Sequence, residues 1–106
     1  MPRIKWTPTA ERDLDDIFDY IGREQLSPTA AANVLRQIND KCSSYARQPQ
    51  MGSLRPDLGS DVRCFPVAGY VVIYRPLPDG ILVLIVVHGA RDIPAVFRNM
   101  FGLDNE

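Results

Sequence analysis

The stretch Val62–Asp92, VRCFPVAGYVVIYRPLPDGILVLIVVHGARD, decides the fold of this chain. It holds three apolar runs that are separated by turn residues, and it closes on a histidine and an arginine. The last run, Ile81–Val87, is entirely aliphatic. Its length and β-branched content predict a strand buried on both faces, whereas a membrane span would need about 20 apolar residues. We therefore expect the polar end of this strand, at His88 and Arg91, to be where the protein contacts another molecule.

The length and composition are those of one soluble domain. The chain has 106 residues, of which 45% are hydrophobic and 24% charged, so a single domain over residues 1–106 is expected. The net charge of −1 argues against a general nucleic-acid-binding surface. The N-terminus lacks the apolar segment of a secretory signal, and no stretch is long enough for a membrane helix, so the cytoplasm is the expected location.

The sequence contains little that could hold a metal ion or a cofactor. Cys42 and Cys64 stand alone, without a CxxC partner, and the chain has one histidine, so no metal site is predicted and both cysteines are expected to be buried. Nucleotide-binding loops of the GxxxxGK[ST] and GxGxxG types are missing, as is the GxSxG motif of hydrolases. We expect no cofactor.

The first half of the chain predicts a strand and two helices. A short strand is expected at Arg3–Trp6, and Thr7 is a predicted N-cap for a helix that runs to about Arg23. Ser27 repeats the cap signal, and a second amphipathic helix follows and ends before Pro49. Two amphipathic helices with a short connection predict an antiparallel hairpin. One face of the first helix is apolar, with Ala10, Leu14, Ile17, Phe18 and Ile21, and the opposite face is acidic.

The second half predicts a loop, three strands and a weak helix. Residues 47–61 contain two prolines and two glycines and are expected to form a loop. Ala68-Gly69 is the first predicted turn, and the second is Pro76–Gly80, in which Asp-Gly is the strongest signal. After a possible cap at Asp92, a helix is expected, followed by a frayed tail. The three strands are expected at Val62–Pro66, Tyr70–Arg75 and Ile81–His88, and the helix at Ile93–Phe101.

These elements predict an α+β fold of two layers. The helix hairpin would pack on one face of a mostly antiparallel sheet of about four strands, and the C-terminal segment would cover part of the other face. A sheet face that is only partly covered is a natural docking groove for another polypeptide.

Few residues are candidates for catalysis. The helical carboxylates Asp13, Asp16 and Asp19 lack an apolar setting that would separate their pKa values, so we do not assign them to acid–base chemistry. His88 could carry a proton in RNA cleavage, with the phosphate held by Arg63, Arg75 and Arg91. Two structural interpretations remain open. His88 could be a hydrogen-bonded residue at the end of a strand, and Arg91 could form an ion pair with Asp92.

Four segments, taken together, are similar to a known family. The segments are the helical pattern LxxIxxYI (Leu14, Ile17, Tyr20, Ile21), the Gln48-Pro49…Gly52 loop, the strand GYVVIYRP (Gly69–Pro76) and the ending VVHGARDI (Val86–Ile93). In this order they resemble the ParE/RelE superfamily of toxins from type II toxin–antitoxin modules, over nearly the whole chain. RelE-like members are ribosome-dependent mRNA endonucleases with basic residues and often a C-terminal tyrosine. ParE-like members inhibit DNA gyrase.

The resemblance is closer to ParE, because the chain lacks a lysine cluster on a strand and has Ile93 where RelE-like toxins would have a tyrosine. It implies a non-enzymatic toxin that inhibits DNA gyrase, serves plasmid stabilisation and is neutralised by a ParD-like antitoxin. It also implies that nucleic acid is contacted only through the antitoxin complex on its operator. The alternative is a RelE-like mRNA endonuclease with catalytic residues His88, Arg91, Arg63 and Arg75. Our candidates for target binding are Arg63, Arg75, His88, Arg91 and Phe97, and those for antitoxin binding are Leu14, Phe18, Tyr20 and Tyr74.

Overall fold

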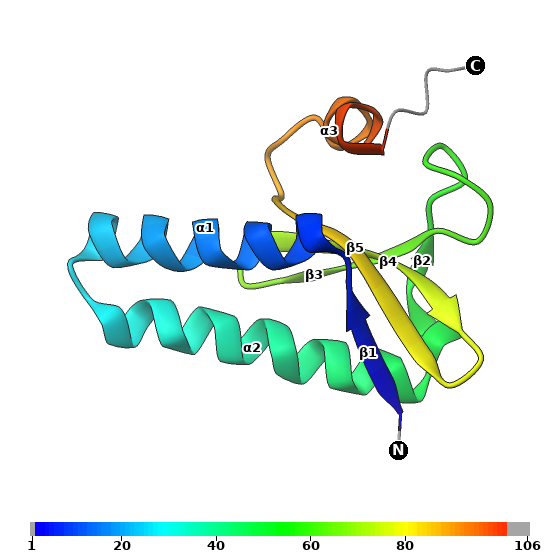
Figure 1. Cartoon of the computed structure of the whole chain (residues 1–106), viewed down its shortest axis with the longest axis horizontal. Coiled ribbons are helices and arrows are strands. Elements are labelled where there is room, and N and C mark those ends of the chain that lie inside the picture. Colours follow the sequence, from blue (N-terminus) through cyan, green and yellow to red (C-terminus); the bar gives the residue numbers. More distant parts are fainter. Residues whose placement is uncertain (1, 102–106) are drawn as a thin grey trace.

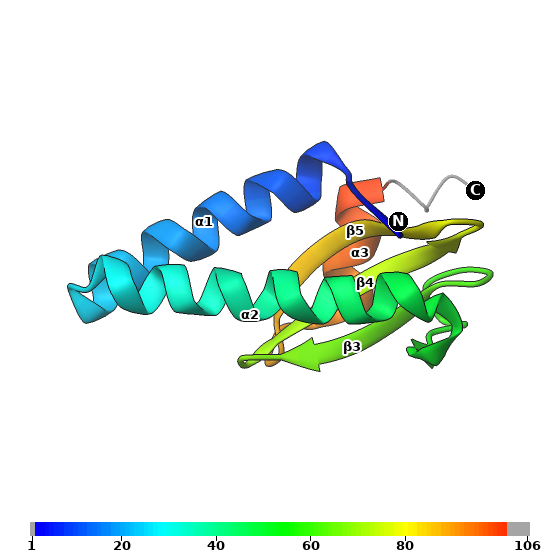
Figure 2. The same cartoon turned by 90° about the horizontal axis from the view of Figure 1, so that it is seen from below.

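A five-stranded sheet with helices on both faces forms the core of the molecule (Figures 1 and 2). The computed structural model describes residues 2–101. The tail, residues 102–106, for which we expected fraying, lies outside the described residues. The elements are β1 (Arg3–Trp6), α1 (Pro8–Gln25), α2 (Pro28–Arg47), the 3₁₀ helix η1 (Pro49–Met51), β2 (Ser53–Leu54), β3 (Arg63–Val67), β4 (Tyr70–Leu77), β5 (Gly80–His88) and α3 (Ile93–Phe101).

The topology confirms the predicted α+β class. The strands lie in the order β1-β5-β4-β3-β2, with β1 parallel to β5 and every other neighbouring pair antiparallel. The expectation of about four strands missed β2, which lies inside the segment that we interpreted as a loop. None of the helices in residues 2–101 is long and apolar enough to cross a membrane.

Side-chain caps define where the helices begin. The backbone N–H of Ala10 donates to Thr7 Oγ1 at 3.0 Å, and that of Ala30 donates to Ser27 Oγ at 3.2 Å. Asp92 caps α3 in the same way, since its Oδ1 accepts from the N–H of Ala95 at 3.3 Å. Each cap satisfies one of the amide groups that a helix start leaves unpaired, so the three predicted cap positions are confirmed.

The two β-hairpins use glycine for different reasons. Ala68 and Gly69 both have positive φ, 55° and 85°, which is the geometry of a tight two-residue hairpin turn, as predicted. The second hairpin differs from our expectation, because its loop is Pro78-Asp79 and Gly80 is already part of β5. A Cβ at Gly80 would collide with the backbone carbonyl of Arg3. Gly80 therefore permits the close approach of β1 and is not needed for the turn.

The sheet separates two hydrophobic clusters. On the face of α1 and α2 the cluster includes Ile17, Ile38 and Phe65, and on the face of α3 it includes Ile73 and Phe97. Strand β5 contributes side chains to both clusters, which confirms the prediction of a strand buried on both faces. Cys42, on α2, belongs to the first cluster and is fully buried, and this burial raises the pKa of its thiol to about 12. Cys64 packs against the second cluster and is half-buried, so the expectation of burial is confirmed for Cys42 and met only in part by Cys64.

Tyr74 fixes the segment between α2 and β3. Its hydroxyl donates to the carbonyl of Pro49 at 2.7 Å and accepts from the N–H of Gly52 at 3.0 Å. Its ring also packs edge-on against Tyr45, with centroids 6.1 Å apart. Gly52 approaches so closely that a Cβ there would collide with the Tyr74 hydroxyl and ring. The segment is therefore held against the core by a buried side chain.

We expect Gly52→Ala to lower the free energy of unfolding by about 1–3 kcal/mol, because the added methyl must displace the buried Tyr74 ring. Gly22→Ala is the matched control, since a Cβ at this helical position meets nothing within 4 Å. That control should raise stability by about 0.5–1 kcal/mol. Urea denaturation measures both variants, and a Gly52→Ala protein as stable as the wild type would contradict this packing.

Candidate functional site

The outer edge of β5 is covered by β1 for only half its length. The parallel pairing of the two strands ends at Trp6 and Val83. Directly beyond this point β5 carries a β-bulge: Tyr74 of β4 pairs with Val83 and Ile73 pairs with Ile85, which leaves Leu84 as the extra residue. A bulge next to the end of a neighbouring strand re-aims the backbone that follows it.

Beyond the end of β1, Thr7 and helix α1 form the hydrogen bonds to the edge of β5. The N–H of Thr7 donates to the carbonyl of Val83 at 3.1 Å, and the Thr7 hydroxyl donates to the carbonyl of Leu84 at 2.7 Å. Further along α1, Asp13 Oδ2 accepts a hydrogen bond from the N–H of Val86 at 3.0 Å. These side chains occupy the places that a longer β1 would have filled.

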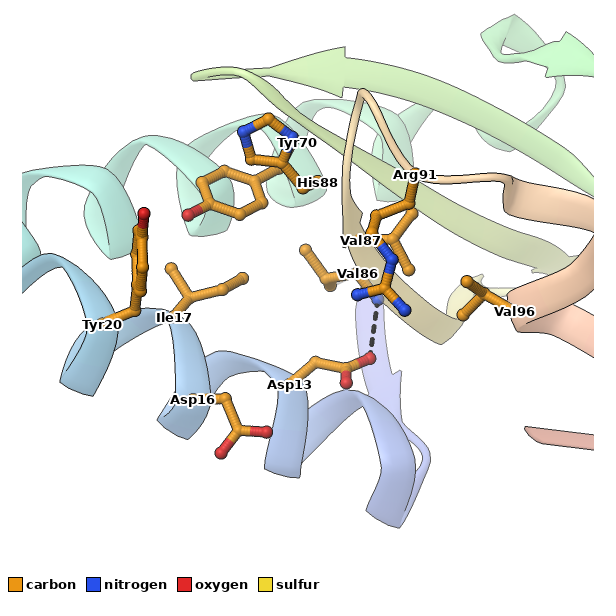
Figure 3. Close-up of a pocket in the computed structure, with 10 residues that line it drawn as sticks. All are labelled: Asp13, Asp16, Ile17, Tyr20, Tyr70, Val86, Val87, His88, Arg91 and Val96. Carbon is orange, nitrogen blue, oxygen red and sulfur yellow. Dashed lines mark hydrogen bonds between the residues drawn. The ribbon is translucent and has the colours of Figure 1, made fainter. Parts of the chain in front are cut away.

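A cavity of about 450 Å³ lies between α1 and the end of β5, and we call it the edge groove (Figure 3). Its floor is apolar, its two aromatic walls come from α1 and β4, and its charged residues come from α1 and from the turn before α3. The lining residues are Asp13, Asp16, Ile17, Tyr20, Tyr70, Val86, Val87, His88, Arg91 and Val96.

Asp13 differs from the other carboxylates of α1 because it is half-buried and bonded to the sheet. Burial raises the pKa of Asp13 above its ordinary value of 3.8, and the nearby Asp16 carboxylate acts in the same direction. The hydrogen bond from Val86 and the positive charges of Arg12 and Arg91 lower the pKa of Asp13 but do not cancel the effect of burial. Our expectation that these carboxylates lack an apolar setting is therefore wrong for Asp13.

His88 and Arg91 both line the edge groove at the end of β5. The backbone N–H of Ala90 donates to His88 Nδ1 at 3.2 Å, and the His88 ring packs edge-on against Tyr70 with centroids 5.5 Å apart. The Arg91 guanidinium points toward Asp13 (Figure 3), and both residues line the edge groove. The alternative pairing of Arg91 with Asp92 is replaced by the helix cap that Asp92 provides.

The other two arginine candidates lie elsewhere. Arg63 Nη1 donates to the carbonyls of Gln50 and Gly52 at 2.9 and 3.0 Å, and Nη2 donates to Gln50 Oε1 at 2.8 Å, so this guanidinium is held by the segment around η1. Arg75 is exposed, with its guanidinium near Gly59. It lies on the α3 face, because it is two residues beyond Ile73 on β4. The four basic candidates therefore do not converge.

The aromatic and aliphatic candidates divide by exposure. Tyr74 is fully buried and Phe97 is 4% exposed, so a partner could not reach these two rings in this conformation. Leu14 is partly buried and packs against the core. Phe18 and Tyr20 on α1 are 39% and 52% exposed. Tyr20 also lines the edge groove. Sequence reasoning missed Asp13 as part of this site, because its bond to Val86 joins residues far apart in the chain.

A metal-binding site was not predicted, and residues 2–101 contain no group of three or more His, Cys, Asp or Glu side chains that could hold a metal ion. The polar groups that line the edge groove are two carboxylates, one guanidinium, one imidazole and two phenols.

Comparison with known proteins gives a consistent family. The family model described as the ParE toxin of the type II toxin–antitoxin system parDE matches residues 4–93. Toxin Y4kP from Sinorhizobium fredii is 34% identical over 96 residues, which cover 89% of this chain and 95% of that protein. Toxin RelE2 from Caulobacter vibrioides is 33% identical over 92 residues, covering 86% of this chain and 99% of that protein.

Two solved structures share the fold. A chain of the chromosomal ParDE system from P. aeruginosa has a TM-score of 0.68 at 23% identity, with 83% of this chain and 96% of that chain covered. A chain of the RelBE2 toxin–antitoxin complex from Mycobacterium tuberculosis has a TM-score of 0.56 at 24% identity, with 83% and 99% covered. At these identities the likeness concerns the fold.

The raised pKa of Asp13 leads to a prediction about stability and pH. The folded chain holds a proton on Asp13 more tightly than the unfolded chain does, so ionised Asp13 lowers stability at pH values above its folded pKa. We expect Asp13→Asn, which keeps an oxygen acceptor for Val86, to raise the free energy of unfolding at neutral pH by less than about 1 kcal/mol. This gain should shrink as the pH falls through the folded pKa toward 3.8, because the wild-type carboxyl then becomes neutral as well.

Urea denaturation at neutral pH and near pH 4 measures this difference. The exposed Asp15 on the same helix supplies the control Asp15→Asn, which should not reproduce the effect. An Asp13→Asn protein that is clearly less stable than the wild type at neutral pH would show that the bond to Val86 outweighs the burial of the charge.

Proposed function

The chain belongs to the ParE toxin family of type II toxin–antitoxin systems, and from this premise we propose that it inhibits DNA gyrase and is neutralised by a ParD-like antitoxin. Action on gyrase places the protein in the bacterial cytoplasm. The observation that carries the proposal is the dispersal of the basic side chains, which favours a toxin that binds a protein over one that cleaves RNA.

RNA cleavage by attack of the 2′-hydroxyl needs cations gathered around the scissile phosphate, together with an acid and a base. Arg63 is held by backbone carbonyls near η1, and Arg75 lies on the α3 face. His88 and Arg91 do share a cavity, but its other charged residues are Asp13 and Asp16. Two carboxylates beside a phosphate site would repel the substrate.

The second candidate function is a RelE-like, ribosome-dependent mRNA endonuclease. It is favoured by the 33% identity to the relative named toxin RelE2. This function would require His88 to act as a proton carrier next to Arg91, and it would need a cation supplied from outside the edge groove. Inhibition of gyrase requires neither a proton carrier nor an additional cation.

The exposed members of the candidate sets are the ones that can contact a partner directly. For the target these are Arg75, His88 and Arg91, and for the antitoxin Phe18 and Tyr20. Phe97 would act through the position of α3, because its ring packs under that helix. Arg63 and Tyr74 would likewise act by holding the segment around η1.

We expect the purified chain to inhibit supercoiling of relaxed plasmid by DNA gyrase, and to leave transcripts intact in a ribosome-containing translation reaction. Supercoiling is read on agarose gels and cleavage by primer extension. Addition of the antitoxin should restore supercoiling. Cut transcripts together with undisturbed gyrase would establish the endonuclease instead.

Arg91→Ala should weaken gyrase inhibition by at least about tenfold, equivalent to about 1.4 kcal/mol, because the variant loses an exposed guanidinium that we assign to target binding. Arg36→Ala is the matched control, because Arg36 is also exposed but lies on α2, where it bonds to Asn33. The concentration of toxin that halves the supercoiling rate measures both. Equal losses in the two variants would remove Arg91 from the target-binding surface.

A further inference from the structure

Asp13 is the half-buried carboxylate of the edge groove, and its charge is not needed for its hydrogen bond. Its Oδ2 accepts from the N–H of Val86 at 3.0 Å, but the neutral oxygen of an amide side chain could accept this bond as well. Ionised Asp13 also lowers stability, because burial raises the pKa of this carboxyl. A charge that the fold does not require, in a groove that also contains a guanidinium, indicates a function for the charge itself.

Arg91 has a fixed backbone and a side chain that direct contacts do not hold. Its N–H donates to the carbonyl of His88 at 3.0 Å in the turn after β5. Its guanidinium makes no direct hydrogen bond or ion pair with residues 2–101. A long side chain of this kind loses rotamer freedom when a partner fixes it, and that loss weakens binding. Any group that restricts the side chain beforehand therefore strengthens binding through Arg91.

Asp13 is placed to restrict Arg91. Figure 3 shows the Arg91 side chain extending from the turn back toward Asp13, and its positive charge lowers the pKa of that carboxyl, so the two charges attract each other. The bond from Val86 fixes the carboxylate against β5, which gives this attraction a fixed origin. Asp16 also lines the edge groove, but it is exposed, so water screens its charge more strongly.

We propose that Asp13 is a positioning residue for the target-binding site: its carboxylate, anchored to Val86, holds the Arg91 guanidinium at the edge groove in the orientation that binds the target. The proposal rests on the proposed function, which assigns Arg91 to contact with gyrase. Asp13 does not need to touch the target, because it acts by reducing the number of orientations that Arg91 gives up on binding. The small loss of stability from the half-buried charge is thus retained for function.

A double-mutant cycle tests whether Asp13 acts through Arg91. Asp13→Asn, which keeps an acceptor for Val86 and removes the charge, should raise the toxin concentration that halves the supercoiling rate by about threefold. In the Arg91→Ala background the same change should have no effect, because the side chain that Asp13 positions is missing. An equal loss in both backgrounds, or a loss in neither, would overturn the proposal.

Two other residues of α1 supply the controls. Arg12 is the second cation that lowers the pKa of Asp13, but it is exposed and does not line the edge groove. Asp13→Asn should therefore keep its full effect in the Arg12→Ala background. Asp15→Asn removes the same charge from the exposed surface of the helix and should leave inhibition unchanged. If the effect of Asp13→Asn disappeared with Arg12 and persisted without Arg91, the assignment of Arg91 as the positioned cation would be wrong.

A spectroscopic measurement on the free chain tests the positioning without the target. Nuclear magnetic relaxation of the Arg91 side-chain Nε–H should show a more ordered group in the wild type than in Asp13→Asn, because the carboxylate restricts the guanidinium. Arg36, which bonds to Asn33 on α2, is the reference and should relax equally in both proteins. Equal order of the Arg91 side chain in the two proteins would contradict the positioning role.

The two measurements separate this proposal from the proposed function. Intact gyrase inhibition, together with an effect of Asp13→Asn that does not depend on Arg91, would contradict only the positioning role. An Arg91 side chain that is ordered by Asp13 in a chain that does not inhibit gyrase would support the positioning and contradict only the proposed target.

Discussion

The arrangement of helices and sheet depends on the hydrogen bonds of Thr7. This residue ends β1 with an N–H bond to Val83, caps α1 by accepting from Ala10, and donates its hydroxyl to Leu84. One residue therefore ties the start of α1 to the middle of β5. Because the chain turns from strand to helix at this point, the second half of β5 is left without β1 beside it. The edge groove is a direct consequence of this early turn.

The bulge at Leu84 changes which side chains of β5 face the helices on each side of the sheet. Before the bulge, Ile81 and Val83 face α1 and α2; after it, Val86 faces them while Ile85 and Val87 face α3. The extra residue shifts the alternation by one, and an uninterrupted aliphatic run can accommodate this shift because every side chain is apolar on either face. The shift also directs the amide of Val86 toward Asp13. The packing of β5 and the position of the edge groove thus follow from one irregularity.

Local signals in the sequence predicted most of the fold. The caps at Thr7 and Ser27 and the turn at Ala68-Gly69 depend on residues within three positions of each other, so they could be recognised directly. The misinterpreted features depend on distant partners. Gly80 is required by the backbone of Arg3, and the short β2 forms because Arg63 and Tyr74 hold the segment before it.

The candidate site shows the same contrast between local and distant residues. His88 and Arg91 are close in sequence and both line the edge groove, whereas the bond from Val86 to Asp13 spans two elements far apart in the chain. In the proposed function, this site presents His88 and Arg91 to the target. The bond from Val86 holds the Asp13 carboxylate beside Arg91, whose positive charge offsets part of the cost of burying that carboxylate.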